Sequence, residues 1–521
     1  MNMIDFFDAG VSNHPDAACF EDWSGGLPPL SYAEAGARTC QIARALQSLG
    51  LSAGFHGAVL SGNTVSAFLA LLGVIRAQGV WLPVNARNSL DSNIDFLADM
   101  DCDVLFYQAS YSDQIALIRN KVAGIRHFIC LDSLDCGADL SLDDFIKGHS
   151  GEMFSPSFDP EALAVIMGTG GTTGRSKGVS LSHRNVTMTF ANQMSAMHVT
   201  EGMTMLAAAP ITHSAGSLCL PFMSRGGRII LMDGIDPQTL LQSLEQERVN
   251  AIFLPPTVIY ALLAQPNVRD FDYSALRYLI YGAAPMSPDK LAEALDIFGP
   301  VMLQVYGQSE VPGAITVLRP EEHFIDGKVA PRQRLLSAGR PFPFTRVAVM
   351  NEEGNLLPEP GMVGEVVAQG DIVMKGYYKN AEATSEARCN GWHCTGDVGY
   401  FDDQGYLFIV DRKKDMIVTG GFNVFSSEVE AAVMAHPAVK DCAVIGIPHE
   451  KWGEAVQAVV ELRPGQSLIP EQLIKFVKDQ LGSVKAPKDV EIVAQLPRSS
   501  VGKVLKKVIR EKYWKDQERM V

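Results

Sequence analysis

Met167-Gly-Thr-Gly-Gly-Thr-Thr-Gly-Arg-Ser-Lys-Gly178 is the most informative segment of the chain. Its glycines let the backbone curve closely around a ligand and expose N–H groups, its hydroxyls add donors, and Lys177 adds a positive charge. The preceding run, Ala162-Leu-Ala-Val-Ile-Met167, has the pattern of a buried strand that leads directly into the loop. Lys177 follows Ser176 and precedes Gly178, whereas the lysine of a P-loop follows a glycine and precedes Ser or Thr. The segment therefore predicts a phosphate-binding loop of another class.

The composition is that of a globular protein, with 47% hydrophobic and 20% charged residues among 521. This length exceeds what one ordinary hydrophobic core accommodates, so we expect two or more domains. The formal net charge of −15 argues against nucleic acid as the principal partner, because a phosphate backbone needs a basic face. The nine cysteines form no C-x-x-C pair, which suits reduced thiols in a cytoplasm better than a disulfide framework.

Two stretches bear on targeting and membranes. Residues 1–10 carry acidic side chains and no basic leader, so we expect no signal peptide. The most apolar long stretch, 65–84, is interrupted by Arg76 and Gln78, which favours a buried helix followed by a strand over a membrane span. We therefore expect a cytoplasmic protein without a membrane span.

Short apolar runs of strand-like pattern alternate with helical patterns, such as 32–49 and 289–298, from Leu30 to about Leu318. Alternation of this kind predicts α/β layers with largely parallel sheets. The predicted strands in this region are 56–60, 103–106, 127–131, 228–231, 251–254 and 278–281.

The pattern changes at about residue 337. Residues 337–410 contain short strands and turn signals, which predict a small β-rich subdomain. The charged run Asp411-Arg-Lys-Lys-Asp415 is the best candidate for an interdomain linker. A compact α+β pattern follows it, with predicted helices at 427–436 and 471–481 and predicted strands at 443–447 and 455–462.

Four further segments carry groups that suit a nucleotide. Tyr281-Gly-Ala-Ala-Pro285 follows a strand, and its small residues leave the backbone open to a flat ring. Tyr306-Gly-Gln-Ser-Glu310 offers an aromatic face, a hydroxyl and a carboxylate. Trp392-His-Cys-Thr-Gly-Asp397 places a carboxylate after a turn, where it can accept bonds from a sugar diol. Arg498-Ser-Ser-Val-Gly-Lys503 presents a lysine ahead of an amphipathic helix.

In this order and at these separations, the motifs resemble those of the adenylate-forming (ANL) superfamily, over roughly residues 10 to 515. The resemblance implies an α/β fold. Its large N-terminal domain, 1–410, would hold two α/β subdomains and a distorted β-barrel. Its small mobile α+β C-terminal domain, 411–521, would follow a hinge near 411–415. It also implies an enzyme that activates a carboxylate with Mg-ATP, releases pyrophosphate and transfers the acyl group from AMP to a thiol.

The same resemblance implies three groups of ATP- and AMP-binding residues. The loop that grips the β- and γ-phosphates would contain Thr169, Gly170, Gly171, Thr172, Thr173, Gly174 and Lys177. Adenine and the α-phosphate would be held by Gly282, Ala283, Ala284, Pro285, Tyr306, Gly307, Gln308 and Ser309, with Ser309 on the α-phosphate. The ribose hydroxyls would be bound by Asp397, with Arg412 nearby.

Three residues would be catalytic by this resemblance. Lys503 would bridge the substrate carboxylate and the α-phosphate, and His213 would lie beside the acyl pocket and gate access of CoA. Glu310 would hold Mg²⁺, together with Thr169. Lys414 would be the hinge residue. Coenzyme A would be the co-substrate, and its pantetheine would pass the loop formed by Gly420, Gly421 and Phe422.

The chain departs from the family pattern at three positions. Gly170 replaces a common Ser or Thr, Ser176 replaces the frequent Pro before Lys177, and Arg498 replaces a common Lys. None of these changes removes a group assigned to catalysis. They bear on nucleotide affinity, and Ser176 predicts a less rigid loop than Pro would give.

The leading hypothesis is an AMP-forming carboxylate–CoA ligase, and the alternative is an acid–AMP ligase that loads a separate carrier protein. An amino-acid-activating domain is disfavoured, because no aspartate stands near His213 to pair with a substrate ammonium. A non-catalytic nucleotide-binding protein would not need Glu310, Asp397 and Lys503 together. The mostly small residues of the expected acyl pocket leave volume, which favours a medium or bulky apolar acid (fatty, aryl or alicyclic) over acetate. These are residues 213–216, 282–284 and 306–307. We also expect a homodimer.

Replacing Lys503 with alanine tests the division of labour that the resemblance implies. Attack of a carboxylate on ATP brings negative charges together, so losing one preorganised cation should slow adenylation by roughly 10²–10³-fold. Thioester formation from preformed acyl-AMP should be much less affected. Acid-dependent ATP–pyrophosphate exchange measures the first half-reaction and CoA-dependent release of AMP measures the second. Equal losses in both would contradict the assignment.

Overall fold

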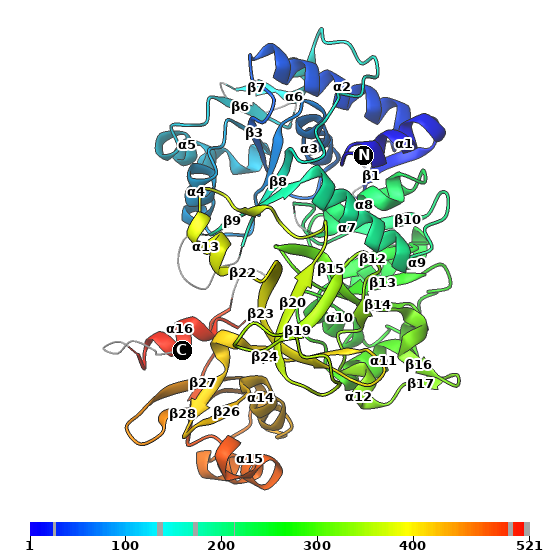
Figure 1. Ribbon diagram of the computed structural model, residues 1–521. Helices are drawn as coiled ribbons and strands as arrows, with labels where there is room; N and C mark the ends of the chain where they lie inside the picture. Colours follow the sequence, from blue (N-terminus) through cyan, green and yellow to red (C-terminus); the bar gives the residue numbers. More distant parts are fainter. Residues whose placement is uncertain are drawn as a thin grey trace. The chain divides into compact units, whose positions relative to one another are not determined.

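The computed structural model describes residues 1–23, 25, 28–132, 139–169, 176–212, 214–498 and 504–514 (Figure 1). These residues form two compact units. The first contains the described residues up to 169, together with 176–347 and 368–393, and the second contains 348–367 and the described residues from 394 onward. The expected division into domains 1–410 and 411–521 stays a prediction.

One sheet of the first unit has eight strands in the order β21-β9-β8-β4-β3-β5-β6-β7. Its strands from β8 through β7 are parallel to their neighbours in that series, whereas β9 is antiparallel to both β8 and β21. The bounds are β3 His56–Leu60, β4 Val80–Pro83, β5 Val104–Tyr107, β6 His127–Cys130, β7 Leu140–Ser141, β8 Leu163–Gly168, β9 Gly178–Ser182 and β21 Gly376–Tyr377.

The other large sheet has nine strands in the order β18-β15-β14-β13-β12-β10-β11-β1-β2. Strands β14, β13, β12, β10, β11 and β1 are parallel to their neighbours, and β2, β15 and β18 pair antiparallel at the two ends. The bounds are β1 Ala18–Asp22, β2 Leu30–Ser31, β10 Thr204–Ala207, β11 Arg228–Leu231, β12 Ala251–Leu254, β13 Tyr278–Tyr281, β14 Met302–Gln308, β15 Val311–Leu318 and β18 Arg340–Pro341. Two parallel-rich sheets confirm the predicted α/β layers.

Helices of the first unit alternate with these strands along the chain, as the sequence predicted. Side-chain hydrogen bonds cap the N-termini of several helices. At the start of α2, Ser31 Oγ accepts a hydrogen bond from Glu34 N, and the Glu34 carboxylate accepts one from Ser31 N, which together form a capping box. The helices are α1 Asp5–Asn13, α2 Tyr32–Ser48, α3 Val65–Arg76, α4 Leu90–Asp99, α5 Ser112–Lys121, α6 Leu142–Ile146, α7 His183–Ala196, α8 Ser214–Met223, α9 Pro237–Gln246, α10 Pro256–Leu263, α11 Pro288–Phe298, α12 Arg332–Leu335 and α13 Ala381–Glu386. Shorter elements are η1 Ala109–Tyr111, η2 Pro320–His323, β16 Phe324–Ile325 and β17 Lys328–Val329.

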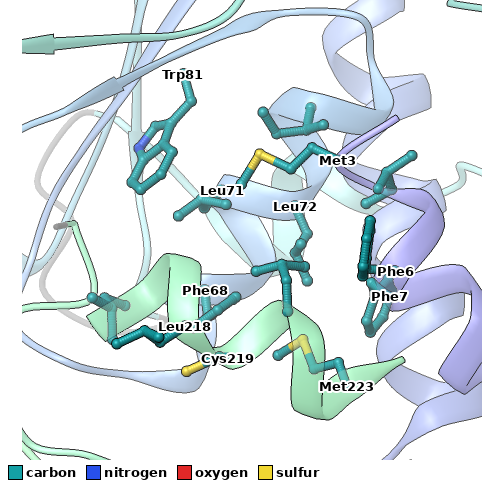
Figure 2. Close-up of a cluster of buried hydrophobic side chains, with 14 of the residues drawn as sticks. Met3, Phe6, Phe7, Phe68, Leu71, Leu72, Trp81, Leu218, Cys219 and Met223 are labelled. Atoms are coloured by element: carbon teal, nitrogen blue, oxygen red, sulfur yellow. The ribbon is translucent and has the colours of Figure 1, made fainter. Parts of the chain in front are cut away.

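The largest hydrophobic core lies around α3. Figure 2 shows side chains of α1, α3 and α8 packed together, with Met3 and Trp81 beside them. Nearly every residue of α3 is buried, which explains why its sequence is apolar on all sides. None of the helices among the described residues combines the length and hydropathy that a membrane crossing requires. The stretch 65–84 is therefore a core helix followed by a core strand, as predicted.

The β-rich part of the chain forms a sheet of its own, of which residues 348–367 and 394–412 belong to the second unit. Strands β19 Arg346–Met350, β20 Gly364–Gln369, β22 Arg388–Cys389, β23 Trp392–Phe401 and β24 Leu407–Arg412 form a five-stranded sheet, as expected for 337–410. The charged run 411–415 completes β24 and forms the 3₁₀ turn η3 Lys413–Asp415.

A separate five-stranded sheet follows in the second unit. It has the order β26-β25-β28-β27, with β29 pairing parallel to β28. Its elements are β25 Ile417–Thr419, β26 Phe422–Val424, α14 Ser426–Met434, β27 Val439–His449, β28 Gly453–Leu462, α15 Pro470–Lys485, β29 Asp489–Val493 and α16 Lys506–Glu511. Strand β27 begins four residues before the predicted run 443–447 and ends two residues after it, and β28 begins two residues before the predicted run 455–462.

Arg76, which interrupts the apolar stretch in the sequence, forms a buried ion pair. Its Nη1 lies 3.1 Å from Oδ2 of Asp8 in α1, and it also donates to Phe154 O at 2.7 Å and Thr39 Oγ1 at 3.1 Å. The side chain of Arg76 is 0% exposed and that of Asp8 is 12% exposed. The ion pair and its hydrogen bonds therefore offset the desolvation of a charge at the end of α3.

Replacing Arg76 with alanine should lower the free energy of unfolding by about 3–5 kcal/mol, because Asp8 then stays buried without its cation. Replacing Arg38, whose exposed pair with Asp143 spans 3.3 Å, should cost less than about 1 kcal/mol. Urea titration of the full-length variants measures both values. Similar losses in the two variants would contradict the role given to the buried pair.

Candidate active site

The expected phosphate loop joins two antiparallel strands. Strand β8 ends at Gly168, which is opposite Gly178, the first residue of β9. Thr169 N donates to Lys177 O at 2.9 Å, and Ser176 Oγ donates to Thr169 O at 2.7 Å. The two ends of the loop are therefore closed by both backbone and side-chain hydrogen bonds. The hydroxyl of Ser176 donates a hydrogen bond that the proline common at this position in the family cannot donate.

Several expected site residues lie outside the described part of the chain. These are Gly170, Gly171, Thr172, Thr173, Gly174, His213 and Lys503. The described neighbours Thr169 and Lys177 place the start and end of the phosphate loop at one edge of the eight-stranded sheet.

The segment expected around adenine follows β13 directly. Strands β13 and β14 are parallel, with Tyr281 opposite Gln304, so Gly282 lies beside the part of β14 that carries Tyr306. A Cβ atom at Gly282 would lie 2.5 Å from the carbonyl oxygen of Val305, which leaves room only for glycine. Residues 283–285 are exposed beyond this contact. The structure thus brings both expected adenine segments to the carboxyl edge of the nine-stranded sheet.

Glu310 stands in the turn between β14 and β15, next to Ser309. Its Oε1 accepts a hydrogen bond from the hydroxyl of Tyr377 at 2.7 Å, and its backbone oxygen accepts one from Met374 N at 2.9 Å. The ammonium of Lys177 lies 5.0 Å from the centre of the Tyr377 ring, which is within cation–π range. Tyr377 therefore contacts two predicted site residues that are 133 positions apart in the sequence.

Tyr377 was missed by sequence reasoning. It belongs to β21, which pairs with β9 so that Tyr377 is opposite Val179, two residues after Lys177. No local sequence pattern indicates that two strands almost 200 residues apart pair with each other. Burial and the neighbouring Glu310 carboxylate raise the pKa of Tyr377, so its phenol stays a hydrogen-bond donor.

In the second unit, the two residues expected at the ribose, Asp397 and Arg412, form an ion pair. Asp397 in β23 is opposite Arg412 in β24, and Arg412 Nε lies 2.6 Å from Asp397 Oδ1. The Asp397 side chain is only 4% exposed, whereas that of Arg412 is 41% exposed. A buried carboxylate is thus oriented by a cation that reaches solvent.

The segment 411–415 is part of a network of charged groups. Asp411 accepts hydrogen bonds from the backbone and hydroxyl of Ser426, and Lys506 Nζ lies 2.7 Å from Glu430 and donates to Ser426 Oγ at 2.6 Å. Arg510 pairs with Asp415 at 2.8 Å. Lys414, the expected hinge residue, lies in the 3₁₀ turn between these two carboxylates.

The expected pantetheine loop is a tight hairpin turn. Thr419 of β25 is opposite Phe422 of β26, so Gly420 and Gly421 are the two loop residues. Their φ angles of +59° and +82° are those of a type I′ turn, which glycine adopts without strain. The Phe422 ring is 60% exposed beside it. Two glycines and an exposed aromatic ring therefore stand at the tip of the hairpin.

Comparison with known proteins identifies the family. A model described as AMP-binding enzyme matches residues 7–378, and one described as AMP-binding enzyme C-terminal domain matches 428–503. A feruloyl-CoA synthase from Amycolatopsis is 34% identical over 496 residues, which cover 94% of this chain and 95% of that protein. The medium/long-chain-fatty-acid–CoA ligase FadD8 of Mycobacterium tuberculosis is 34% identical over 499 residues, which cover 93% and 86% of the two chains.

A solved structure shows the same fold. ATP-bound MatB from Rhodopseudomonas palustris is 32% identical, with a TM-score of 0.87 and a match that covers 99% of both chains. The predicted fold, with a large N-terminal domain and a small C-terminal one, is that of these enzymes. The chain belongs to the AMP-binding (ANL) superfamily of adenylate-forming enzymes and is an AMP-forming acid–thiol ligase.

Proposed function

We propose that this ligase activates a medium or bulky apolar carboxylic acid (fatty, aryl or alicyclic) as its acyl-adenylate and transfers the acyl group to coenzyme A. The observation that supports this most is the cluster of Lys177, Tyr377 and Glu310 at the closed end of the loop between β8 and β9. It combines a cation for phosphates with a carboxylate for a metal ion. Attack of one anion on another needs both kinds of group.

In the first half-reaction, Lys177 and the loop that begins at Thr169 would hold the β- and γ-phosphates. Glu310 suits Mg²⁺, because its Oε2 makes no hydrogen bond to any described residue and hard cations prefer carboxylate oxygen. Bound Mg²⁺ would neutralise charge on the phosphates as the acid attacks. Ser309 would contact the α-phosphate, and Gly282 to Pro285 with Tyr306 would hold adenine.

The ribose and the second half-reaction would depend on residues of the second unit. Asp397 would accept hydrogen bonds from the ribose hydroxyls, and its pair with Arg412 would orient it. Lys503 would bridge the acid and the α-phosphate, and Lys414 would be the pivot between the two half-reactions. The hairpin tip with Gly420, Gly421 and Phe422 would line the pantetheine path, while His213 would control entry to the acyl pocket.

The small residues near the expected acyl pocket do not support a large acid by themselves. A Cβ atom at Gly216 would lie 1.9 Å from the carbonyl oxygen of Ile211, and one at Gly307 would lie 2.5 Å from Gly313 N. These glycines, like Gly282, are required by close backbone approach rather than by pocket volume. Support for an aryl or fatty acid therefore comes from the relatives that act on feruloyl and fatty acyl groups.

The compartment and the assembly state are also proposals. All eight described cysteines are free thiols, which fits a cytoplasmic location. A homodimer would be tested by light scattering of the purified protein.

A panel of acids distinguishes the proposed substrate from other classes. Feruloyl-type aryl acids, medium-chain and long-chain fatty acids, alicyclic acids and acetate would be compared by acid-dependent ATP–pyrophosphate exchange and by CoA-dependent release of AMP. We expect the highest specificity constant among the apolar acids and thioester formation with free CoA. Exchange without AMP release on adding CoA, restored by a carrier protein, would support the alternative carrier-loading ligase. Acetate as the best acid would contradict the proposed class.

Replacing Tyr377 with phenylalanine removes the hydrogen bond to Glu310 but keeps the ring under Lys177. Because a hydrogen bond to a charged group contributes about 1.5–3 kcal/mol, we expect the Mg²⁺ concentration for half-maximal adenylation to rise by roughly tenfold or more. Replacing Tyr377 with leucine should also weaken binding of ATP, since the cation–π contact is lost. Initial rates against Mg²⁺ and calorimetric titration with ATP measure the two effects separately.

Tyr378 supplies a matched control for this prediction. Its hydroxyl donates to Asp101 at 2.8 Å, so it is an adjacent tyrosine that binds a different carboxylate. The Tyr378→Phe variant should keep the wild-type Mg²⁺ dependence. If both phenylalanine variants shift that dependence equally, Tyr377 does not position Glu310.

A further inference from the structure

A concave site lies at the amino edge of the nine-stranded sheet. It has a volume of about 590 Å³ and is lined by residues 194–199, which lead from α7 toward β10, and by Arg225, 277–278, Pro300 and 319–321. All of these residues belong to the first unit. None of them was assigned a role from the sequence, and none belongs to the motifs that hold ATP in the proposed function.

This cavity is separate from the expected nucleotide site. Tyr278 is the first residue of β13 and lines the cavity, whereas Gly282 follows the last residue of the same strand. At about 3.3 Å per residue, four positions along a strand separate these points by roughly 13 Å. Because β10, β13 and β14 are parallel through β12, their amino ends share one edge and their carboxyl ends share the other. The cavity therefore stands on the edge opposite the adenine segments.

Three guanidinium groups line the cavity without a carboxylate partner. Among the described residues, no acid lies within ion-pair distance of Arg225, Arg277 or Arg319. Other arginines nearby are paired: Arg228 lies 3.0 Å from Glu21 and 2.8 Å from Glu247. Within the lining, Glu321 is the single acidic side chain. The cavity thus carries a net charge near +2 in a chain whose net charge is −15.

The backbone that presents these arginines is fixed by hydrogen bonds. His198 N donates to the hydroxyl of Tyr278 at 2.8 Å, which ties the segment after α7 to the start of β13. Gly202 N donates to Arg225 O at 3.2 Å, and Arg277 N donates to Asn250 O at 2.8 Å. The backbone that carries these arginines is therefore already ordered, and ligand binding has to order only their side chains.

We propose that this cavity binds a phosphate-bearing anion. A guanidinium fork matches two phosphate oxygens, and a phosphate monoester carries close to two negative charges at neutral pH, which balances the excess charge of the cavity. The volume lies within the range of small-ligand sites. A soluble phosphate compound and a phospholipid headgroup share this chemistry. The site is independent of the proposed acid and of the ATP motifs.

The experiment compares two triple variants of the full-length protein. Arg225→Ala/Arg277→Ala/Arg319→Ala removes the cavity arginines. Arg248→Ala/Arg269→Ala/Arg332→Ala removes three exposed arginines of the same unit that do have acidic partners, so the net charges are equal. One probe is inorganic phosphate in calorimetry with AMP present to fill the nucleotide site. The other is co-sedimentation with phosphatidylcholine vesicles, with or without phosphatidic acid, whose headgroup is a phosphate monoester.

We expect the wild type and the control variant to bind one probe and the cavity variant to bind it at least about tenfold more weakly. Binding of phosphate alone identifies a soluble ligand, and sedimentation only with phosphatidic acid identifies a lipid headgroup. Acid-dependent ATP–pyrophosphate exchange should be equal in all three proteins, which shows that they are folded and that the proposed function stands separately. Failure of the wild type to bind either probe, or equal binding by both variants, overturns the proposal.

Discussion

The candidate phosphate site depends on the hydrogen bonding of one strand, β9, on both of its edges. On one edge it pairs with β8, which closes the ends of the loop between Gly168 and Gly178. On the other edge it pairs with the two residues of β21, which bring Tyr377 alongside Lys177. Because Tyr377 also donates to Glu310, three segments distant in sequence meet at one point. A one-residue slip of β21 would turn Tyr377 to the other face and separate these groups.

Much of the fold could be predicted because its strands are short apolar runs between clear helical patterns. Strands β3, β11, β12 and β13 begin and end at the predicted residues, since each is buried along its whole length or nearly so. The nucleotide motifs were visible for a related reason. Residues 282–285 follow β13 and the phosphate loop follows β8, and a loop at the carboxyl end of a parallel strand is where such sheets bind ligands.

What the sequence could not reveal arises from contacts between distant segments. Tyr377 has no local signal, because its role comes from the pairing of β21 with β9. The glycines at 216, 282 and 307 were interpreted as pocket volume, whereas each is required by a backbone atom 2.6 Å or less from where a Cβ would stand. Local composition gives the size of a residue. It does not tell whether a ligand or another backbone occupies the space beside it.

In the second unit, the composition of the charged run 411–415 also fails to reveal the contacts that the run makes. Its composition suggests a solvated linker, yet Asp411 is buried and bonded to Ser426, while Asp415 pairs with Arg510 of α16. Burial raises the pKa of Asp411 and of Glu430, and Lys506, the first residue of α16, contacts Glu430 and Ser426 of α14.

The parallel sheet of β10, β12, β13 and β14 also has two chemically different edges. Its carboxyl edge carries Tyr306 and the exposed residues 283–285, while its amino edge carries three arginines that have no acidic partner among the described residues. Parallel strands make these edges non-equivalent, because every loop that leaves a strand stands on one side and every loop that enters stands on the other. Residues on one edge can therefore change without disturbing the geometry of the other. That separation lets a single fold keep its adenylation chemistry while a second surface acquires a ligand of its own.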